Sequence, residues 1–150
     1  MKLVVQRVSN AKVDVDGKTV GKIGKGFLVL CGITHTDTEK EADFLAGKLC
    51  KLRVFEDENG KMNLSVKDLG LGLFLVSNFT LYGDCRHGRR PSYSSGAAVD
   101  EAARIYDAFL DYAKKNAGVE IHSGLFQADM QIDVHLSGPV TLLLDSDKVF

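Results

Sequence analysis

The feature that most constrains the fold of this chain is an uninterrupted apolar run at residues 27–33, which reads FLVLCGI. A strand with one face in water alternates apolar and polar residues, whereas a strand covered on both faces is apolar throughout. We therefore expect residues 27–33 to form a central strand that is buried on both faces. The rest of the chain has to supply the cover for those two faces.

Strand signals recur along the rest of the chain as short runs rich in β-branched and apolar residues. Two turn signals separate some of them, Asp16-Gly17 and the segment from Asp57 to Gly60, and each predicts a hairpin. The longest apolar candidate is residues 71–81. The other predicted strands are residues 3–8, 11–15, 18–20, 53–55, 61–64, 119–122, 130–136 and 140–144.

Two segments carry helix signals instead. Thr38-Glu39-Lys40-Glu41 matches a capping box, and apolar residues then recur at helical spacing up to Leu52. A second amphipathic pattern begins at Val99, ends in Lys114-Lys115 and is followed by Gly118, a typical stop signal. Strands thus outnumber helices, and the sequence predicts a mixed, strand-dominated α/β fold with two main helices. At this length, we expect residues 1–150 to form a single domain.

Several classes of protein are disfavoured by composition. The chain is 45% hydrophobic and 26% charged, and no apolar run approaches the ~20 residues of a membrane helix. We expect a cytoplasmic protein without a membrane partner. Its cysteines, Cys31, Cys50 and Cys85, form no CxxC pair, and the histidines show no metal-ligand spacing, so we expect no metal and no cofactor. Cys31 and Cys50 are predicted to be core thiols.

The net charge of −1 argues against a protein that coats nucleic acid by bulk electrostatics. One local basic patch stands out, the segment RHGRR at residues 86–90, which contains Arg86, Arg89 and Arg90. It lies in a long polar loop predicted at residues 82–96, and loops of this length often carry function. The patch is either a solvated loop or a contact for phosphate groups.

No nucleophile with a base is evident in the sequence. The motifs GxSxG, HExxH, the P-loop and GxGxxG before a helix are all absent. His122 and His135 lie in strand patterns and are expected to be structural or on the surface. Ser77 and Thr80 lie at the end of the long apolar strand predicted at residues 71–81, so Thr80 is a candidate nucleophile. The alternative is a strand residue whose hydroxyl bonds to the backbone.

The pair Gly138-Pro139 permits two interpretations. Glycine lets a carbonyl group approach a ligand without an intervening side chain, and an X-Pro bond can be cis, which aims that carbonyl. The alternative is an ordinary hairpin turn between the strands predicted at residues 130–136 and 140–144. From these residues alone, the hairpin turn is the favoured interpretation.

Taken together, these segments resemble the D-aminoacyl-tRNA deacylase family over almost the whole chain. The resemblance includes QRVSNAKVDVDG at residues 6–17, SNFTLYGDCRHGRRPSYS at residues 77–94, and LFQADMQIDVHLSGPVTLLLDS at residues 125–146. The family signatures Ser-Gln-Phe-Thr and Asn-x-Gly-Pro-Val-Thr fall on residues 77–80 and 136–141. Three positions depart from the family pattern: Asn78 replaces glutamine, Leu136 replaces asparagine, and Gln127 replaces glycine.

The resemblance implies a layered fold with a mixed, barrel-like sheet, and a hydrolase that removes D-amino acids from aminoacyl-tRNA in chiral proofreading. It also implies a homodimer in which a cis Gly138-Pro139 turn of one subunit enters the pocket of the other. The main-chain carbonyl groups of Gly138 and Pro139 would bind the amino group of a D-aminoacyl ester, and an L side chain would collide with the turn. Glycyl-tRNA, which has no side chain to reject, would also be cleaved.

The resemblance also assigns roles to residues. Ser77, Asn78, Phe79 and Thr80 would form the catalytic segment, in which backbone N–H groups around Phe79 and Thr80 stabilise the oxyanion while a water attacks, assisted by the 2′-hydroxyl of the substrate. Further residues would contact the substrate: Gly138, Pro139, Arg7, Met130 and Ala128. Arg7 would support the Gly-Pro turn, although it fits an ordinary strand-edge charge equally well. Arg86, Arg89 and Arg90 would contact tRNA phosphates.

Two other functions remain open on the same residues. Asn78 and Leu136 are compatible with a nucleic-acid-binding protein on this scaffold whose pocket no longer catalyses a reaction. A related group with a trans Gly-Pro bond prefers certain L-aminoacyl-tRNAs, but it carries a different sequence in place of SNFTL.

Overall fold

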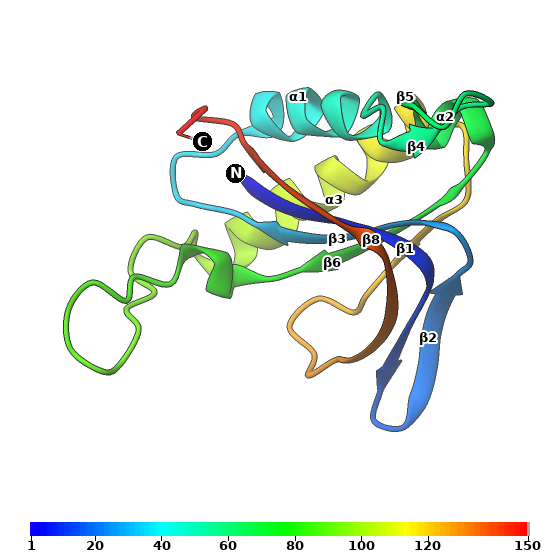
Figure 1. The fold of residues 1–150 in the computed structure, drawn as a ribbon. Coiled ribbons are helices and arrows are strands. Elements are labelled where there is room, and N and C mark those ends of the chain that lie inside the picture. The colour runs from blue at the N-terminus through cyan, green and yellow to red at the C-terminus, as the bar shows by residue number, and fades with distance from the viewer. Residues whose placement is uncertain (150) are drawn as a thin grey trace.

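A computed structural model describes residues 1–149 of the chain (Figure 1). A six-stranded mixed sheet is covered on one face by two helices, α1 (Glu39–Cys50) and α3 (Val99–Ala117). The sheet contains β1 (Lys2–Val15), β2 (Lys18–Ile23), β3 (Gly26–Gly32), β6 (Gly72–Ser77), β7 (Ile121–Ser123) and β8 (Gln131–Asp145). The strand-dominated α/β fold predicted from the sequence is confirmed, and so are its two main helices.

The central strand β3 lies between β1, to which it is antiparallel, and β6, to which it is parallel. Phe27, Val29 and Cys31 face the core beneath the helices, and Leu28 faces a second core on the other side of the sheet. All four side chains are at most 2% exposed. The prediction of a strand buried on both faces is therefore confirmed.

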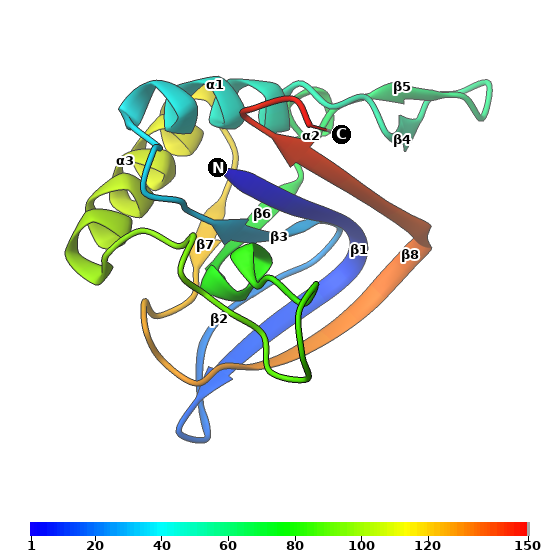
Figure 2. The same cartoon turned by 90° about the vertical axis from the view of Figure 1, so that its left-hand side faces the viewer.

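The sheet curls because β1 is long and pairs with three strands. One edge of β1 pairs with β3 near its start and with β2 near its end, and the other edge pairs with β8 along almost its whole length. Figure 2 shows β1, β2 and β8 bending around the second core to give a barrel-like form. Two irregularities interrupt the β1–β8 register, one between Gln6 and Val8, where Arg7 lies, and one between Val8 and Asn10, and they re-aim the strands there.

The helices begin and end where the sequence indicates. Thr38 and Glu41 form the expected capping box of α1, and Gly118 ends α3 in a left-handed conformation with φ of 62°. The predicted second hairpin is present as β4 (Phe55–Glu56) and β5 (Met62–Leu64). A third, short helix, α2 (Val66–Leu69), was not predicted.

Two strand predictions are wrong in detail. The strand predicted at residues 71–81 ends at Ser77, and a 3-10 helix, η1 (Phe79–Tyr82), follows it because the Asn78 side chain caps that turn. The strands predicted on either side of Gly138-Pro139 are one strand, β8, and both halves pair with β1. The hairpin interpretation of this pair is therefore wrong, because the chain keeps its direction through it.

The part of the chain that the structure describes, residues 1–149, holds no helix long and apolar enough to cross a membrane. Its three cysteines are all free: Cys31 and Cys50 are buried and Cys85 is exposed. Burial raises the pKa of the Cys31 thiol, and it raises the pKa of the Cys50 thiol to about 11. The prediction of two core thiols is confirmed.

We expect a thiol-alkylating reagent at pH 8 to modify Cys85 alone in the folded protein. Reactivity requires an accessible thiolate, and burial denies both access and ionisation to Cys31 and Cys50. Intact-mass spectrometry should show one adduct in buffer and three in denaturant. Rapid modification of Cys31 or Cys50 in buffer would contradict the packing described here.

Candidate active site

The first part of the site is the turn that follows β6. Ser77, the last residue of the strand, pairs with Cys31 of β3, and the Asn78 N–H donates to the Cys31 carbonyl over 2.7 Å. The chain then turns into η1. The Asn78 Oδ1 atom accepts two hydrogen bonds from Thr80, one from its N–H at 3.1 Å and one from its hydroxyl at 2.5 Å. Asn78 therefore fixes the start of this turn.

The interpretation of Thr80 as a strand residue with its hydroxyl bonded to the backbone is wrong. Thr80 lies in η1 and not in a strand, and its hydroxyl donates to the Asn78 side chain and not to the backbone. No histidine, lysine or carboxylate of residues 1–149 bonds to that hydroxyl. An amide oxygen does not remove a hydroxyl proton, so nothing in the observed arrangement activates Thr80 as a nucleophile.

Phe79 lies on the outside of the same turn. Its side chain is 63% exposed, and its ring meets the edge of the Tyr93 ring with 5.1 Å between the centroids. As the first residue of η1, Phe79 has a backbone N–H without an acceptor inside that helix. This N–H is a candidate oxyanion donor, whereas the Thr80 N–H is already bonded to Asn78. No sequence pattern indicates the contact with Tyr93.

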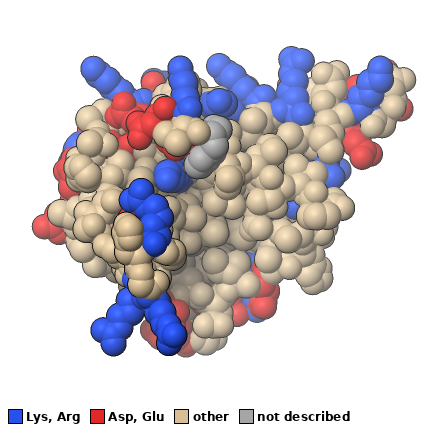
Figure 3. All heavy atoms as spheres, turned by 60° about the vertical axis from the view of Figure 1, so that its left-hand side comes forward, with Lys and Arg blue, Asp and Glu red and all other residues tan. Residues whose placement is uncertain are grey.

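The basic loop follows η1 and carries the three candidate arginines. Figure 3 shows basic side chains on this part of the surface, beside a hollowed area with little charge. Arg86 makes two bonds to Asp84, at 2.9 and 2.7 Å, and this lowers the pKa of Asp84 to about 2. Arg89 and Arg90 are exposed and form no ion pair within residues 1–149. They are the more available cations of the loop.

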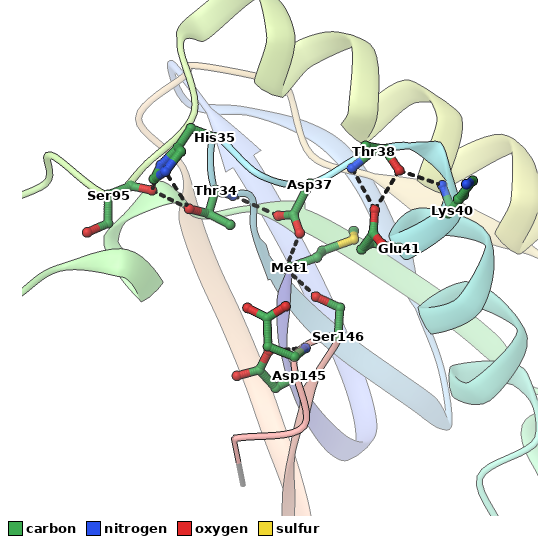
Figure 4. A network of polar contacts seen from close by, with 11 residues as sticks. Met1, Thr34, His35, Asp37, Thr38, Lys40, Glu41, Ser95, Asp145 and Ser146 are labelled. Carbon is green, nitrogen blue, oxygen red and sulfur yellow. Dashed lines mark hydrogen bonds and ion pairs between the residues drawn. The ribbon is translucent and has the colours of Figure 1, made fainter.

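A polar network holds the far end of this loop (Figure 4). The Thr34 hydroxyl donates to the Ser95 carbonyl, and the Thr34 N–H donates to Asp37 Oδ2 over 2.8 Å. The ammonium group of Met1 donates to Asp37 and also to the Ser146 hydroxyl, at 2.7 Å. The loop exit is therefore tied to the turn before α1, and through that turn to Met1 and Ser146, which lie next to the start of β1 and the end of β8.

The second part of the site is the Gly138-Pro139 turn within β8. Its peptide bond is cis, as the resemblance implies. Arg7 is only 8% exposed, and it donates from Nε to the Ser137 carbonyl at 3.2 Å and from Nη1 to the Val54 carbonyl at 2.6 Å. Arg7 thus bridges the turn and the segment before β4. Of the two interpretations of Arg7, contact with the turn is the one observed.

The remaining candidates are Met130, at the second core, and Ala128, in a turn. Met130 packs against this core near Val76, and its sulfur lies next to Gly124. Ala128 closes a turn with a bond from its N–H to the Leu125 carbonyl at 3.2 Å. Gln127 has a φ of 63°, a left-handed conformation that suits the glycine of the family pattern better than it suits glutamine.

The two parts of the site lie far apart within one chain. Ser77 pairs with Cys31, which pairs with Leu3, whereas the Gly138-Pro139 turn lies opposite Arg7, four residues further along β1. At ~3.3 Å per residue and ~4.8 Å between strands, the offset is ~13 Å along β1 and ~14 Å across the sheet. One chain therefore does not bring Thr80 and Gly138 into a single pocket.

The histidines take structural or surface positions. His122 bonds to Glu120 at 2.6 Å and stacks on Phe74, and His135 bonds to Asn10 at 3.0 Å. Within residues 1–149, no group of three or more histidine, cysteine, aspartate or glutamate side chains could hold a metal ion.

Comparison with known proteins identifies the class to which this fold and site belong. The family model of D-Tyr-tRNA(Tyr) deacylase matches residues 4–145. Curated proteins named D-aminoacyl-tRNA deacylase match over the full length of both chains, at 55% identity in Thermosipho africanus and 51% in Clostridioides difficile. The chain belongs to the D-Tyr-tRNA(Tyr) deacylase family.

Solved structures share this fold. A structure described as "c-Myc DNA Unwinding Element Binding Protein" is 39% identical, with a TM-score of 0.90 over 97% of this chain and 98% of that one. A probable eukaryotic D-amino acid tRNA deacylase, 17% identical, has a TM-score of 0.83 over 95% of this chain and 97% of its own. The second likeness supports the layered, barrel-like fold that the resemblance implies.

We expect Gly138→Ala to destabilise the protein by roughly 2 kcal/mol. Gly138 has a φ of 123°, and an added Cβ would lie 2.9 Å from Val140 Cγ2 and 3.1 Å from Arg7 Nη2. Urea unfolding should be compared with Gly60→Ala, because Gly60 also has a positive φ, of 71°, but has open space around it. An equal loss of unfolding free energy in the two variants would show that crowding against Arg7 and Val140 does not contribute to the effect of Gly138→Ala.

Proposed function

We propose that this protein hydrolyses the ester bond of D-aminoacyl-tRNA and releases free tRNA and the D-amino acid. The observation that carries the proposal is full-length similarity to D-aminoacyl-tRNA deacylases, at 55% identity, in a chain that keeps Ser77, Phe79, Thr80 and Gly138-Pro139. We infer that a protein with this substrate acts in the cytoplasm. Residues 1–150 would act as one domain, because β1 and β3 contribute to both cores.

The active form would be a homodimer whose pockets form between subunits. The long separation of Thr80 from Gly138 supports this, since a shared pocket needs the turn of a second copy. The β8 strand also supports it, because its second edge has no partner strand in residues 1–149 and exposed Leu136 and Leu143 lie along it. An open edge of this length favours pairing with another chain.

Chirality would be read by the carbonyl groups of the Gly138-Pro139 turn. They would accept hydrogen bonds from the substrate ammonium group, and an L side chain would collide with the same backbone. A conflict of ~3 kcal/mol lowers binding about a hundredfold. Glycyl-tRNA has no side chain to exclude, so we infer that it is also hydrolysed. Support by Arg7 would hold the turn in place from within its own subunit.

The chemistry would rest on positioning. An aminoacyl ester is already activated, so a water molecule needs orientation and the oxyanion needs a donor, which the Phe79 N–H supplies. The 2′-hydroxyl of the terminal ribose would assist. Arg89 and Arg90 would contact tRNA phosphates, and Arg86 would join them on release from Asp84. Met130 and Ala128 would shape the wall of the pocket.

A second candidate function is nucleic-acid binding without hydrolysis. The solved structure that is 39% identical is described as binding a DNA unwinding element, and its fold matches this chain along nearly its whole length. The departures at Asn78 and Leu136 would then explain the absence of turnover. The same basic loop would carry the binding.

Matched D-tyrosyl-, L-tyrosyl- and glycyl-tRNA distinguish these functions. We expect purified protein to release labelled amino acid from the D-tyrosyl and glycyl esters and to leave the L-tyrosyl ester at its rate in buffer. Protein that binds the tRNA and leaves all three esters at their rates in buffer would support the binding function instead. Hydrolysis of the L ester as fast as the D ester would contradict the chiral role of the turn.

Thr80→Ala should keep about one tenth of the D-ester hydrolysis rate, because a covalent nucleophile is not needed. Loss of a nucleophile costs far more, on the order of 10⁴-fold or greater. The measurement is single-turnover release of D-tyrosine, with the folded state and the dimer checked by size-exclusion chromatography. A folded, dimeric variant without measurable hydrolysis would restore Thr80 as a nucleophile.

A further inference from the structure

The side chain of Asn78 receives every proton that Thr80 has to donate. Its Oδ1 atom accepts from the Thr80 N–H at 3.1 Å and from the Thr80 hydroxyl at 2.5 Å. The backbone holds the same geometry, since the Leu81 N–H donates to the Asn78 carbonyl and the Gly83 N–H donates to the Thr80 carbonyl. The orientation of the hydroxyl is therefore fixed on the side of Asn78.

A hydroxyl has one proton and two lone pairs, so this arrangement sets its polarity. With its proton directed at Asn78, the Thr80 oxygen presents only acceptor capacity to any other group. It can then bind an O–H or N–H of the substrate complex, and it cannot donate to a carbonyl or an oxyanion. A freely rotating hydroxyl could act either as a donor or as an acceptor toward the substrate.

We propose that Asn78 is a positioning residue that makes the Thr80 hydroxyl an obligatory acceptor for the O–H group that takes part in hydrolysis. That O–H belongs to the attacking water or to the ribose 2′-hydroxyl of the substrate. The inference rests on the proposed deacylase function. In this step the water oxygen bonds to the carbonyl carbon, the ester C–O bond breaks, and the water proton passes to the leaving 3′-oxygen. Thr80 neither gains nor loses a proton.

The departure from the family glutamine has a physical reason here. Asn78 occupies the N-cap of η1, and a short side chain at an N-cap reaches the N–H two residues on. Glutamine is one methylene longer and is not a favoured N-cap residue. The chain therefore uses asparagine for a local bond to Thr80.

The test is a double-mutant cycle on single-turnover hydrolysis of D-tyrosyl-tRNA. We expect about a tenfold fall in rate for Thr80→Ala and about a fivefold fall for Asn78→Ala. If Asn78 acts through Thr80, the double variant loses about tenfold, as Thr80→Ala does alone. Independent effects multiply, so a loss of about fiftyfold in the double variant would overturn the proposal.

A conservative variant of Asn78 distinguishes a role in positioning the Thr80 hydroxyl from a role only in capping η1. Asn78→Asp keeps an acceptor oxygen at the same reach, so kcat should stay within about threefold of the parent, while its added charge raises KM for tRNA. Asn78→Ala should change kcat and leave KM nearly unchanged. Asn63→Ala, on the exposed β5 strand, is the matched control and should change neither. An Asn78→Asp variant as slow as Asn78→Ala would contradict the acceptor role.

Failure of this inference is distinguishable from failure of the proposed function. A parent protein that does not hydrolyse D-tyrosyl-tRNA overturns both. A parent that hydrolyses the ester, with Asn78→Ala as active as the parent, overturns only the role of Asn78. Circular dichroism and chromatography of each variant establish that the folded dimer is being compared.

Discussion

The pairing of β1 along both of its edges is the interaction on which the rest of the structure depends. One edge fixes β3, and through it β6 and the turn that carries Phe79 and Thr80. The other edge fixes β8 and the Gly138-Pro139 turn. Because the two parts of the site are attached to opposite edges of one strand, their positions are rigidly related and they cannot approach one another within the chain.

Arg7 is a charged side chain that β1 buries between two segments of the chain. Transfer of an unpaired charge from water into a protein interior costs several kcal/mol. Arg7 has no carboxylate partner within residues 1–149, and its bonds go to the carbonyls of Ser137 and Val54 instead. Ser137 belongs to β8 and Val54 to the segment before β4. The guanidinium group that bonds to both carbonyls therefore holds these two segments together. Arg7 itself lies in the first of the two register irregularities between β1 and β8, between Gln6 and Val8.

Sequence patterns predict the buried strand β3 and both main helices correctly. Each of these elements has a signal within its own segment: a continuous apolar run for β3, a capping box for α1 and a terminal glycine for α3. Sequence patterns failed at Ser77 because the end of β6 is set by the Asn78 cap, which an apolar run through Leu81 conceals. They failed at Gly138 because glycine and proline are turn signals in most contexts. Pairing of both halves of β8 with β1 is a tertiary effect that no local pattern contains. The short helix α2 also has a local signal in the sequence, the Ser65–Asp68 capping box.

The candidate site was predicted as a set of residues but not as a geometry. The resemblance supplied Thr80, Phe79, Gly138 and Arg7, yet the direction of the Thr80 hydroxyl depends on Asn78, a position where this chain departs from the family. A departure of this kind is expected to be neutral only if another group takes over the lost role. Here the shorter amide accepts both hydrogen bonds that Thr80 donates, and the backbone N–H of Phe79 stays free as a donor of the turn. The function can therefore persist with a different division of roles among the same four residues.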